Sequence, residues 1–393
     1  MVFAALAWAG AWTCAAQTPD EEFRSVLLKQ AAFTADEFAA LERGEVVVKP
    51  LPAAGKEEVA FCGVVRAQGD PATVFAAFKE SLARSRHRVF LGGGKLGVPP
   101  APEEFQALTL EQRDVEELKR CAVGDCELKM SAAMVERLRR EVDWAARDYP
   151  AAAGRLFRLL LFDLVRDYFT RGDAALVEDD SRAGGAGLNE GRRVLPLSLP
   201  YVEEAAPEFA DYLRSFPRRE LPGVENVLHW SKIRVGLKPV ILLTHTATYT
   251  RLRAGAPQIL VATKQLYATR YFDSSLSLTL LTSVADSPSE TYLLYANRSR
   301  AGALGGLFGG LKRRIFEEAA LDGLRDLLQQ TKLNPVARPA DRSDLQGDGK
   351  GDGAVPRTGR LFRRAGYFFL ALSFVAGLLL LWLRRHDLKT RGT

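Results

Sequence analysis

The chain has few of the residues on which metal binding and redox chemistry depend, with four histidines and four cysteines in 393 residues. None of the histidines stands in the H-x-x-x-H spacing of a helical zinc site. The chain also lacks the G-x-S-x-G elbow of a serine hydrolase and the ordered Walker A loop of a nucleotide-binding protein. We therefore predict no metal, no cofactor and no identifiable catalytic residue.

The cysteine spacing excludes two further kinds of site. Cys121 and Cys126 enclose four residues, whereas c-type haem attachment and thioredoxin-type redox motifs both require two. In an exported protein this pair predicts a short structural disulfide, with Gly124 allowing the tight turn. Cys62 lies in a β-type run, which predicts a buried free thiol.

The chain has no strongly basic surface segment, although its net charge is +6. Eight basic residues flank one apolar run near the C-terminus, and the rest of the chain is close to neutral. They are Arg357, Arg360, Arg363, Arg364, Arg384, Arg385, Lys389 and Arg391. This distribution argues against a nucleic-acid partner.

The two ends of the sequence predict export and membrane anchoring. Residues 1–16 are apolar and end in Cys14-Ala15-Ala16, as in a signal peptide, although no Lys or Arg precedes the apolar run. The uncharged run at 365–383 would span roughly 28 Å as a helix, with Tyr367 and Trp382 at its interfaces. We expect one transmembrane helix in a bacterial cytoplasmic membrane, a main domain outside the cytoplasm (periplasmic) and a cytoplasmic tail at 384–393.

One folded domain is predicted at 17–333, followed by a flexible tether at 334–364 that is rich in proline, glycine and charge. Two helical segments, Asp20–Gln30 and Thr34–Arg43, precede β-type runs at Glu45–Lys49 and Val59–Arg66. Asp70-Pro71 opens a helix. A mostly helical insertion occupies about 91–200, with its clearest helix at Ala151–Thr170.

From Val224 onward the pattern changes to closely spaced strands, which predicts an antiparallel meander. The strands are expected at Val240–Thr250, Ile259–Phe272, Leu276–Val284 and Thr291–Asn297. A long amphipathic helix, Leu311–Lys332, follows them.

The order of these elements is similar to that of a known superfamily. The strand Val59–Arg66 runs into Ala67–Phe75, which matches a small-x-Pro-x-x-Val-aromatic helix entry, and Tyr292–Arg300 leads to a glycine-rich turn and the long helix. The chain resembles the START-like (SRPBCC) superfamily of lipid-transfer, polyketide-cyclase-like and pollen-allergen-like proteins over about 59–80 and 224–332. The resemblance implies an α+β helix-grip fold, in which a curved antiparallel sheet surrounds the long helix and encloses a hydrophobic cavity.

The candidate ligand site follows from the alternation in Val240–Thr250. Its threonines lie on one face, where we expect solvent, and Leu243, His245 and Tyr249 lie on the other, where we expect the long helix. His245 fits either a pocket or a satisfied core position, and the tyrosines fit either a cavity or ordinary strand packing. The predicted ligand-binding residues are Trp230, Leu243, His245, Tyr249, Tyr267, Tyr271, Tyr295, Arg298, Phe316 and Leu324.

Three functions fit these features. The first is non-enzymatic binding or transfer of a lipid or other hydrophobic small molecule at the outer face of the membrane. The second is a structural or protein-interaction module with a filled core. The third is a cyclase- or hydrolase-like enzyme that uses His245 in the cavity.

The membrane topology can be tested with two reporter fusions to the full chain. A reporter fused after Thr393 should be active only in the cytoplasm, and one inserted near Gly349 only outside it, because the exported N-terminus sets the orientation. The reverse pattern of activities would contradict the signal-peptide interpretation.

Overall fold

The computed structural model describes residues 19–86, 89–176, 200–234, 238–253, 255–304 and 309–333. The segments predicted as signal peptide, tether, transmembrane helix and tail lie outside these ranges. Among the described helices, none combines the length and the apolar character that a bilayer crossing requires.

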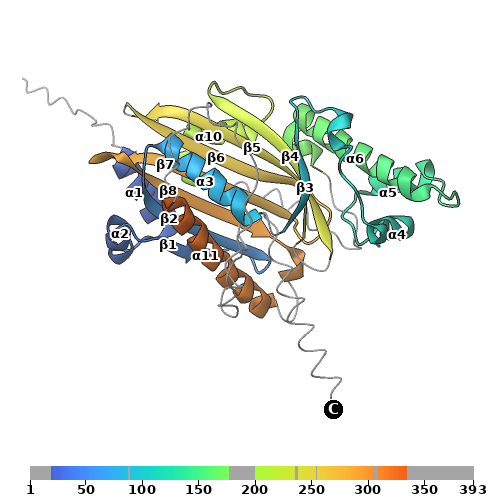
Figure 1. The fold of residues 1–393 in the computed structure, drawn as a ribbon, viewed down its shortest axis with the longest axis horizontal. Coiled ribbons are helices and arrows are strands. Elements are labelled where there is room, and N and C mark those ends of the chain that lie inside the picture. Colours follow the sequence, from blue (N-terminus) through green and yellow to red (C-terminus); the bar gives the residue numbers. More distant parts are fainter. Residues whose placement is uncertain are drawn as a thin grey trace, which may run out of the picture.

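The protein is an α+β structure built on one eight-stranded antiparallel sheet (Figure 1). The strands lie in the order β1-β2-β8-β7-β6-β5-β4-β3. Their bounds are β1 Val47–Pro50, β2 Glu58–Gln68, β3 Phe90–Leu96, β4 Val224–Arg234, β5 Pro239–Arg253, β6 Ala256–Ala268, β7 Ser274–Val284 and β8 Ser287–Arg300.

The antiparallel meander predicted from residue 224 is confirmed, because the five strands β4 to β8 form four consecutive antiparallel pairs in chain order. The last of them, β8, also pairs with the early strand β2 along its whole length, from Glu58 opposite Arg300 to Gln68 opposite Glu290. This long-range pairing joins the N-terminal part of the domain to the meander.

Strand β3 lies within the region that sequence patterns assign to helix and loop, and that assignment is wrong for Phe90–Leu96. Three consecutive glycines hide the strand, because glycine has low β propensity. Strand β4 explains why glycine is suitable here. A Cβ atom on Gly94 would lie 2.6 Å from Nε1 of Trp230, and one on Gly93 would lie 2.8 Å from the Trp230 carbonyl oxygen. The glycines therefore let β3 pack closely on β4.

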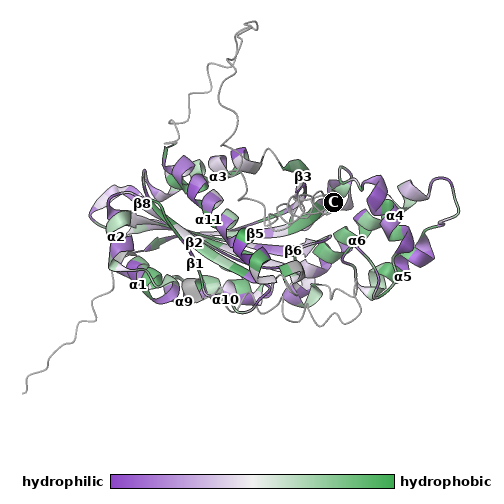
Figure 2. Cartoon of the chain, turned by 90° about the horizontal axis from the view of Figure 1, so that it is seen from below, coloured by the Kyte–Doolittle hydropathy of each residue, from purple (hydrophilic) through white to green (hydrophobic). Residues whose placement is uncertain are grey.

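Helices cover both faces of the sheet (Figure 2). Helices α3 and α11 lie on one face, and α1, α9 and α10 lie on the other, while α4, α5 and α6 extend beyond β3 and β4. The bounds are α1 Pro19–Ala31, α2 Ala35–Glu42, α3 Pro71–Arg86, α4 Gln112–Arg120, α5 Ala132–Glu141, α6 Tyr149–Arg171, α9 Pro200–Ala205, α10 Pro207–Ser215 and α11 Gly309–Leu333.

Capping residues predicted from the sequence mark the starts of two helices. Thr34 caps α2 in a capping box with Glu37. The carboxylate of Asp70 accepts a hydrogen bond of 2.7 Å from the backbone N–H of Thr73 and so caps α3. The predicted helices at Asp20–Gln30, Ala151–Thr170 and Leu311–Lys332 are confirmed as α1, α6 and α11.

The apolar face of β5 packs away from α11, so its predicted orientation is wrong. Leu243 is fully buried against the helices of the insertion, in a cluster that includes Leu161 of α6. Ala247 and Tyr249 pack in a second cluster with helices α1, α9 and α10. The N-terminal and inserted helices, rather than α11, cover the apolar face of β5.

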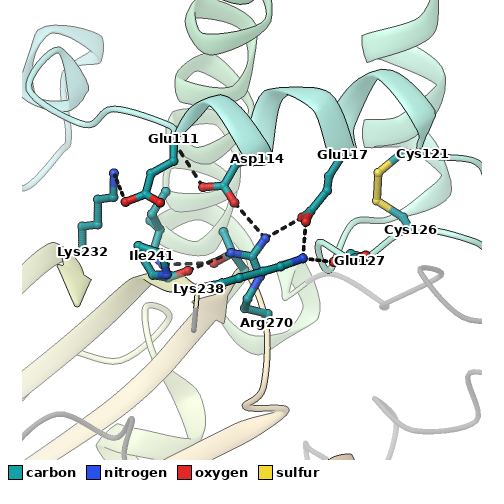
Figure 3. Close-up of polar contacts among 12 residues, drawn as sticks. Glu111, Asp114, Glu117, Cys121, Cys126, Glu127, Lys232, Lys238, Ile241 and Arg270 are labelled. Atoms are coloured by element: carbon teal, nitrogen blue, oxygen red, sulfur yellow. Dashed lines mark hydrogen bonds and ion pairs between the residues drawn. A yellow bond between two sulfur atoms is a disulfide. The ribbon is translucent and has the colours of Figure 1, made fainter. Parts of the chain in front are cut away.

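A buried ion cluster holds α4 against the ends of β5 and β6, and a disulfide closes the turn that follows α4 (Figure 3). The predicted pair Cys121–Cys126 forms the disulfide, and Gly124 in its turn has a φ of +82°. Arg270 is only 5 % exposed and donates to Asp114 at 2.9 Å and to Glu117 at 2.8 Å. Lys238 also pairs with Glu117 and with Glu127. Cys62 is the buried free thiol predicted, and burial raises its pKa to about 12.

Removal of the central cation of this cluster should destabilise the protein strongly. In Arg270→Leu, the buried carboxylates of Asp114 and Glu117 lose the guanidinium that pairs with both of them. We expect the free energy of unfolding to fall by about 3–5 kcal/mol. The matched control is Arg325→Leu, which removes an exposed pair with Asp322 and should cost no more than about 0.5 kcal/mol. Denaturant unfolding compares the two, and equal losses would contradict the structural role of Arg270.

Candidate functional site

A cavity of about 780 Å³ lies between the sheet and the helices α3 and α11. Strands β3 and β4 border it on the side away from β2. We call it the sheet cavity. Its volume is within the range of 300–1,000 Å³ that is typical of sites for drug-sized ligands. By contrast, two pockets against the opposite face of the sheet hold only about 20 Å³ and 10 Å³.

The floor of the sheet cavity is largely polar, although Val227, Leu242 and Val261 also line it. Successive side chains of a strand point to opposite faces, so the polar residues that alternate along four adjacent strands all reach the same face. These floor residues are Thr244, Thr246 and Thr248 of β5, Thr263 of β6, Ser277 and Thr279 of β7, and Asn297 and Ser299 of β8.

Four of the floor residues form a straight row across the strands. Thr246 lies opposite Thr263, Thr263 opposite Ser277, and Ser277 opposite Asn297. Neighbouring strands are about 4.8 Å apart, so the row extends over about 14 Å. We call these four residues the polar row.

Hydrogen bonds between side chains orient part of this floor. The hydroxyls of Thr246 and Thr263 are 3.1 Å apart and share a hydrogen bond. The amide of Asn297 donates to Ser275 Oγ at 3.3 Å, and its carbonyl oxygen accepts from Ser299 Oγ at 2.8 Å. The Asn297 side chain is therefore held in one orientation beside the cavity.

The roof and one side wall of the sheet cavity are apolar. Phe75, Phe78 and Leu82 reach it from α3, and Phe316 and Ala320 reach it from α11. A wall at the β2 and β8 side contains Phe61 and Tyr295, whose ring centroids are 6.4 Å apart. The Tyr295 ring also lies 6.1 Å from Phe78, which joins this wall to the roof.

Three charged residues also line the cavity, and none of them belongs to the polar row. Lys79 of α3 is exposed, and its ammonium lies 4.5 Å from the centre of the Phe75 ring. Lys95 of β3 is also exposed, and Glu225 of β4 lines the cavity beside Thr248. The four residues of the polar row carry no formal charge.

Three of the ten predicted ligand-binding residues, Trp230, Tyr295 and Phe316, line the sheet cavity. The indole of Trp230 also packs among the insertion helices and donates to the Glu104 carbonyl at 3.0 Å. Leu324 faces the same side of the sheet but is fully buried against β2, where a Cβ on Gly63 would lie 2.7 Å from it. It therefore serves packing.

The other six predicted residues lie away from the sheet cavity. Leu243, Tyr249 and Tyr267 pack on the opposite face of the sheet, and the Tyr267 hydroxyl donates to the Lys129 carbonyl at 2.7 Å. Tyr271 follows β6 and packs beside Phe272. Arg298 donates to the Pro52 carbonyl and to Glu58.

His245, the sixth, is a satisfied core residue. Its Nε2–H donates to Asn226 Oδ1 at 2.8 Å, and its Nδ1 accepts from the Tyr168 hydroxyl at 2.9 Å. Asn226 Oδ1 also accepts from Tyr212 at 2.8 Å, and the Phe216 ring centre lies 4.6 Å from the imidazole. Burial, with a smaller effect of the Lys264 charge, lowers the pKa of His245 to about 3. The imidazole is therefore neutral at pH 7.

The polar floor is the part of the site that sequence reasoning missed. A signal was present, because Thr263, Ser277, Thr279 and Asn297 repeat the alternation of the β5 threonines. A polar strand face usually faces solvent, so the pattern alone indicates an exposed face. Only the position of α3 and α11 above these strands turns that face into a cavity floor.

Comparison of the chain with family models, curated proteins and solved structures gives no match. Within the described ranges, no group of three or more His, Cys, Asp or Glu side chains could hold a metal ion. The absence of a cofactor or metal stays a prediction. Any assignment of function therefore depends on the geometry of the sheet cavity.

The buried state of His245 predicts a pH dependence of stability. The pKa is about 3 in the folded protein and about 6.5 when the chain is unfolded, so between these values only the unfolded chain binds the proton. Stability should therefore fall as the pH drops below about 6.5, by about 2 kcal/mol at pH 5.

Denaturant unfolding at pH 7 and pH 5 tests this expectation. His245→Gln should be less stable than the wild type at pH 7. Between pH 7 and pH 5, however, its free energy of unfolding should fall by about 2 kcal/mol less than that of the wild type. Thr246→Val, on the other face of the same strand, should keep the decrease of the wild type. An unchanged pH dependence in His245→Gln would contradict the buried neutral imidazole.

Proposed function

We propose that the protein binds or transfers a lipid or another hydrophobic small molecule in the sheet cavity, without changing it chemically. The observation that carries this proposal is the volume of about 780 Å³ under apolar helices. An apolar pocket with a few convergent polar groups is the usual form of a small-molecule site. Membrane anchoring by residues 365–383, with the domain at the outer face, belongs to the same proposal.

The strand order supports the resemblance to the START-like superfamily. The first long strand, β2, is followed by α3 and pairs with the last strand, β8, while the other strands form the meander. The C-terminal helix α11 then packs across β2 and α3 on one face of the sheet. This arrangement is what a helix-grip fold with an added edge strand β1 and an inserted helical region would have.

The two alternative functions are less well supported. A purely structural module should have a filled core along the whole α11 face, whereas a packed apolar cluster fills only part of that face and the large cavity borders the rest. An enzyme that uses His245 would need that imidazole in the cavity. His245 instead lies on the opposite face, with both ring nitrogens occupied.

Reduction of the cavity volume should abolish ligand binding. Thr246→Trp places an indole in the centre of the floor, whereas the matched variant Thr250→Trp places the same ring on the same strand at an exposed position outside the cavity lining. The measurement is saturable fluorescence of 1-anilinonaphthalene-8-sulfonate with the full-length protein in lipid nanodiscs, with empty nanodiscs as reference.

We expect saturable binding to the wild type and to Thr250→Trp, and a loss of at least tenfold in affinity for Thr246→Trp, because the indole takes up space that the ligand needs. The strand pattern alone predicts the opposite result, because it places Leu243 at the cavity and Thr246 in solvent. Absence of saturable binding to the wild type, or equal binding to both variants, would reject the cavity as the ligand site.

A further inference from the structure

We propose that the ligand of the sheet cavity is a rigid facial amphiphile, a flat molecule with uncharged hydroxyl or carbonyl groups along one face and hydrocarbon on the other. This inference rests on the proposed function and names the ligand class of the same site. Such a molecule differs from a fatty acid or a phospholipid, which has its polar group at one end and which we call an end-to-end amphiphile.

The sheet supplies most of the uncharged polar groups of the cavity, beside apolar strand residues such as Val261 and Leu242, and the helices supply aromatic rings. The polar row lies in the floor, and Phe75, Phe78 and Phe316 lie in the roof. A ligand between them therefore meets hydrogen-bonding groups on one side and aromatic rings on the other. An end-to-end amphiphile would need the polar groups gathered at one end of the cavity, and the polar row instead crosses four strands.

The floor hydroxyls have hydrogen-bonding capacity that the protein does not use. In the described part of the chain, Ser277 and Thr279 form no side-chain hydrogen bond although each is less than 10 % exposed. Thr246 and Thr263 share one bond between them, so each pair member keeps further capacity. Hydrocarbon placed on these groups would leave them unpaired at a free-energy cost, whereas a hydroxylated face would pair with them.

The floor also lacks the charge that an anionic group would need. The charged residues that line the cavity, Lys79, Lys95 and Glu225, come from α3, β3 and β4, and none belongs to the polar row. An ionised group is costly to bury without a partner. The ligand face on the polar row should therefore be uncharged, and a charged end of the molecule would lie near the exposed lysines.

Two probes with the same ring skeleton and the same carboxylate test this inference. Cholate carries three hydroxyls on one face, and 5β-cholanate carries none. Displacement of 1-anilinonaphthalene-8-sulfonate from the full-length protein in nanodiscs, below the micellar concentrations of the probes, measures both affinities. Hexadecanoate serves as the end-to-end amphiphile. We expect cholate to bind at least fivefold more tightly than either other probe, relative to its partition into empty nanodiscs.

Conservative variants of the polar row connect the preference to the floor hydroxyls. Thr263→Val and Ser277→Ala should each weaken cholate binding by about 2- to 10-fold, which corresponds to one net hydrogen bond, and should leave cholanate unchanged. Thr250→Val, at the exposed position on β5, is the matched control and should change neither affinity.

Failure of this inference differs from failure of the proposed function. If 1-anilinonaphthalene-8-sulfonate binds the wild type but cholate shows no preference, or if Thr263→Val weakens cholate and cholanate equally, the facial ligand class is rejected while the cavity site stands. If no probe binds saturably and Thr246→Trp has no effect, both proposals are rejected.

Discussion

The two faces of one antiparallel sheet differ in polarity, and the arrangement of the helices depends on that difference. The apolar face needs a close cover, and the N-terminal helices and the insertion supply it in two packed clusters. The other face carries threonines, serines and an asparagine in its centre. Apolar helices pressed against these groups would bury hydroxyls without partners. Helix α11 instead packs on β2, and α3 packs on apolar parts of β6, β7 and β8, so that a cavity remains over the polar residues.

The long-range contacts that hold this arrangement lie in two regions of the sheet. At one end, β2 pairs with β8, and Gly63 gives α11 close access to the sheet through Leu324. Elsewhere, the buried ion pairs of Arg270 with Asp114 and Glu117 hold α4 to the ends of β5 and β6. The insertion that precedes the meander thereby becomes part of the cover of its apolar face.

Local sequence signals predicted most of the elements and some of the site. The capping residues Thr34 and Asp70 mark helix starts because they bond to backbone groups a few residues away. The predicted disulfide and the buried thiol of Cys62 agree with the structure. Strand β3 escaped prediction because its glycines are explained by Trp230, a residue on a strand far along the chain. Tyr295 and Phe316 were correctly placed at the cavity because their elements face it regardless of how β5 is oriented.

The sequence alone determined most of the strands and helices, though not β3, and which residues of each predicted strand share a face, since both follow from the period of neighbouring side chains. It did not determine which cover each face receives. An alternating strand shows one polar and one apolar face, and solvent, a helix or a cavity can lie over the polar one. That choice was made by the tertiary structure, because α3, α11, β2 and the insertion come from distant parts of the chain. The same placement put the β5 threonines in the cavity floor and His245 in a closed hydrogen-bond network on the other side.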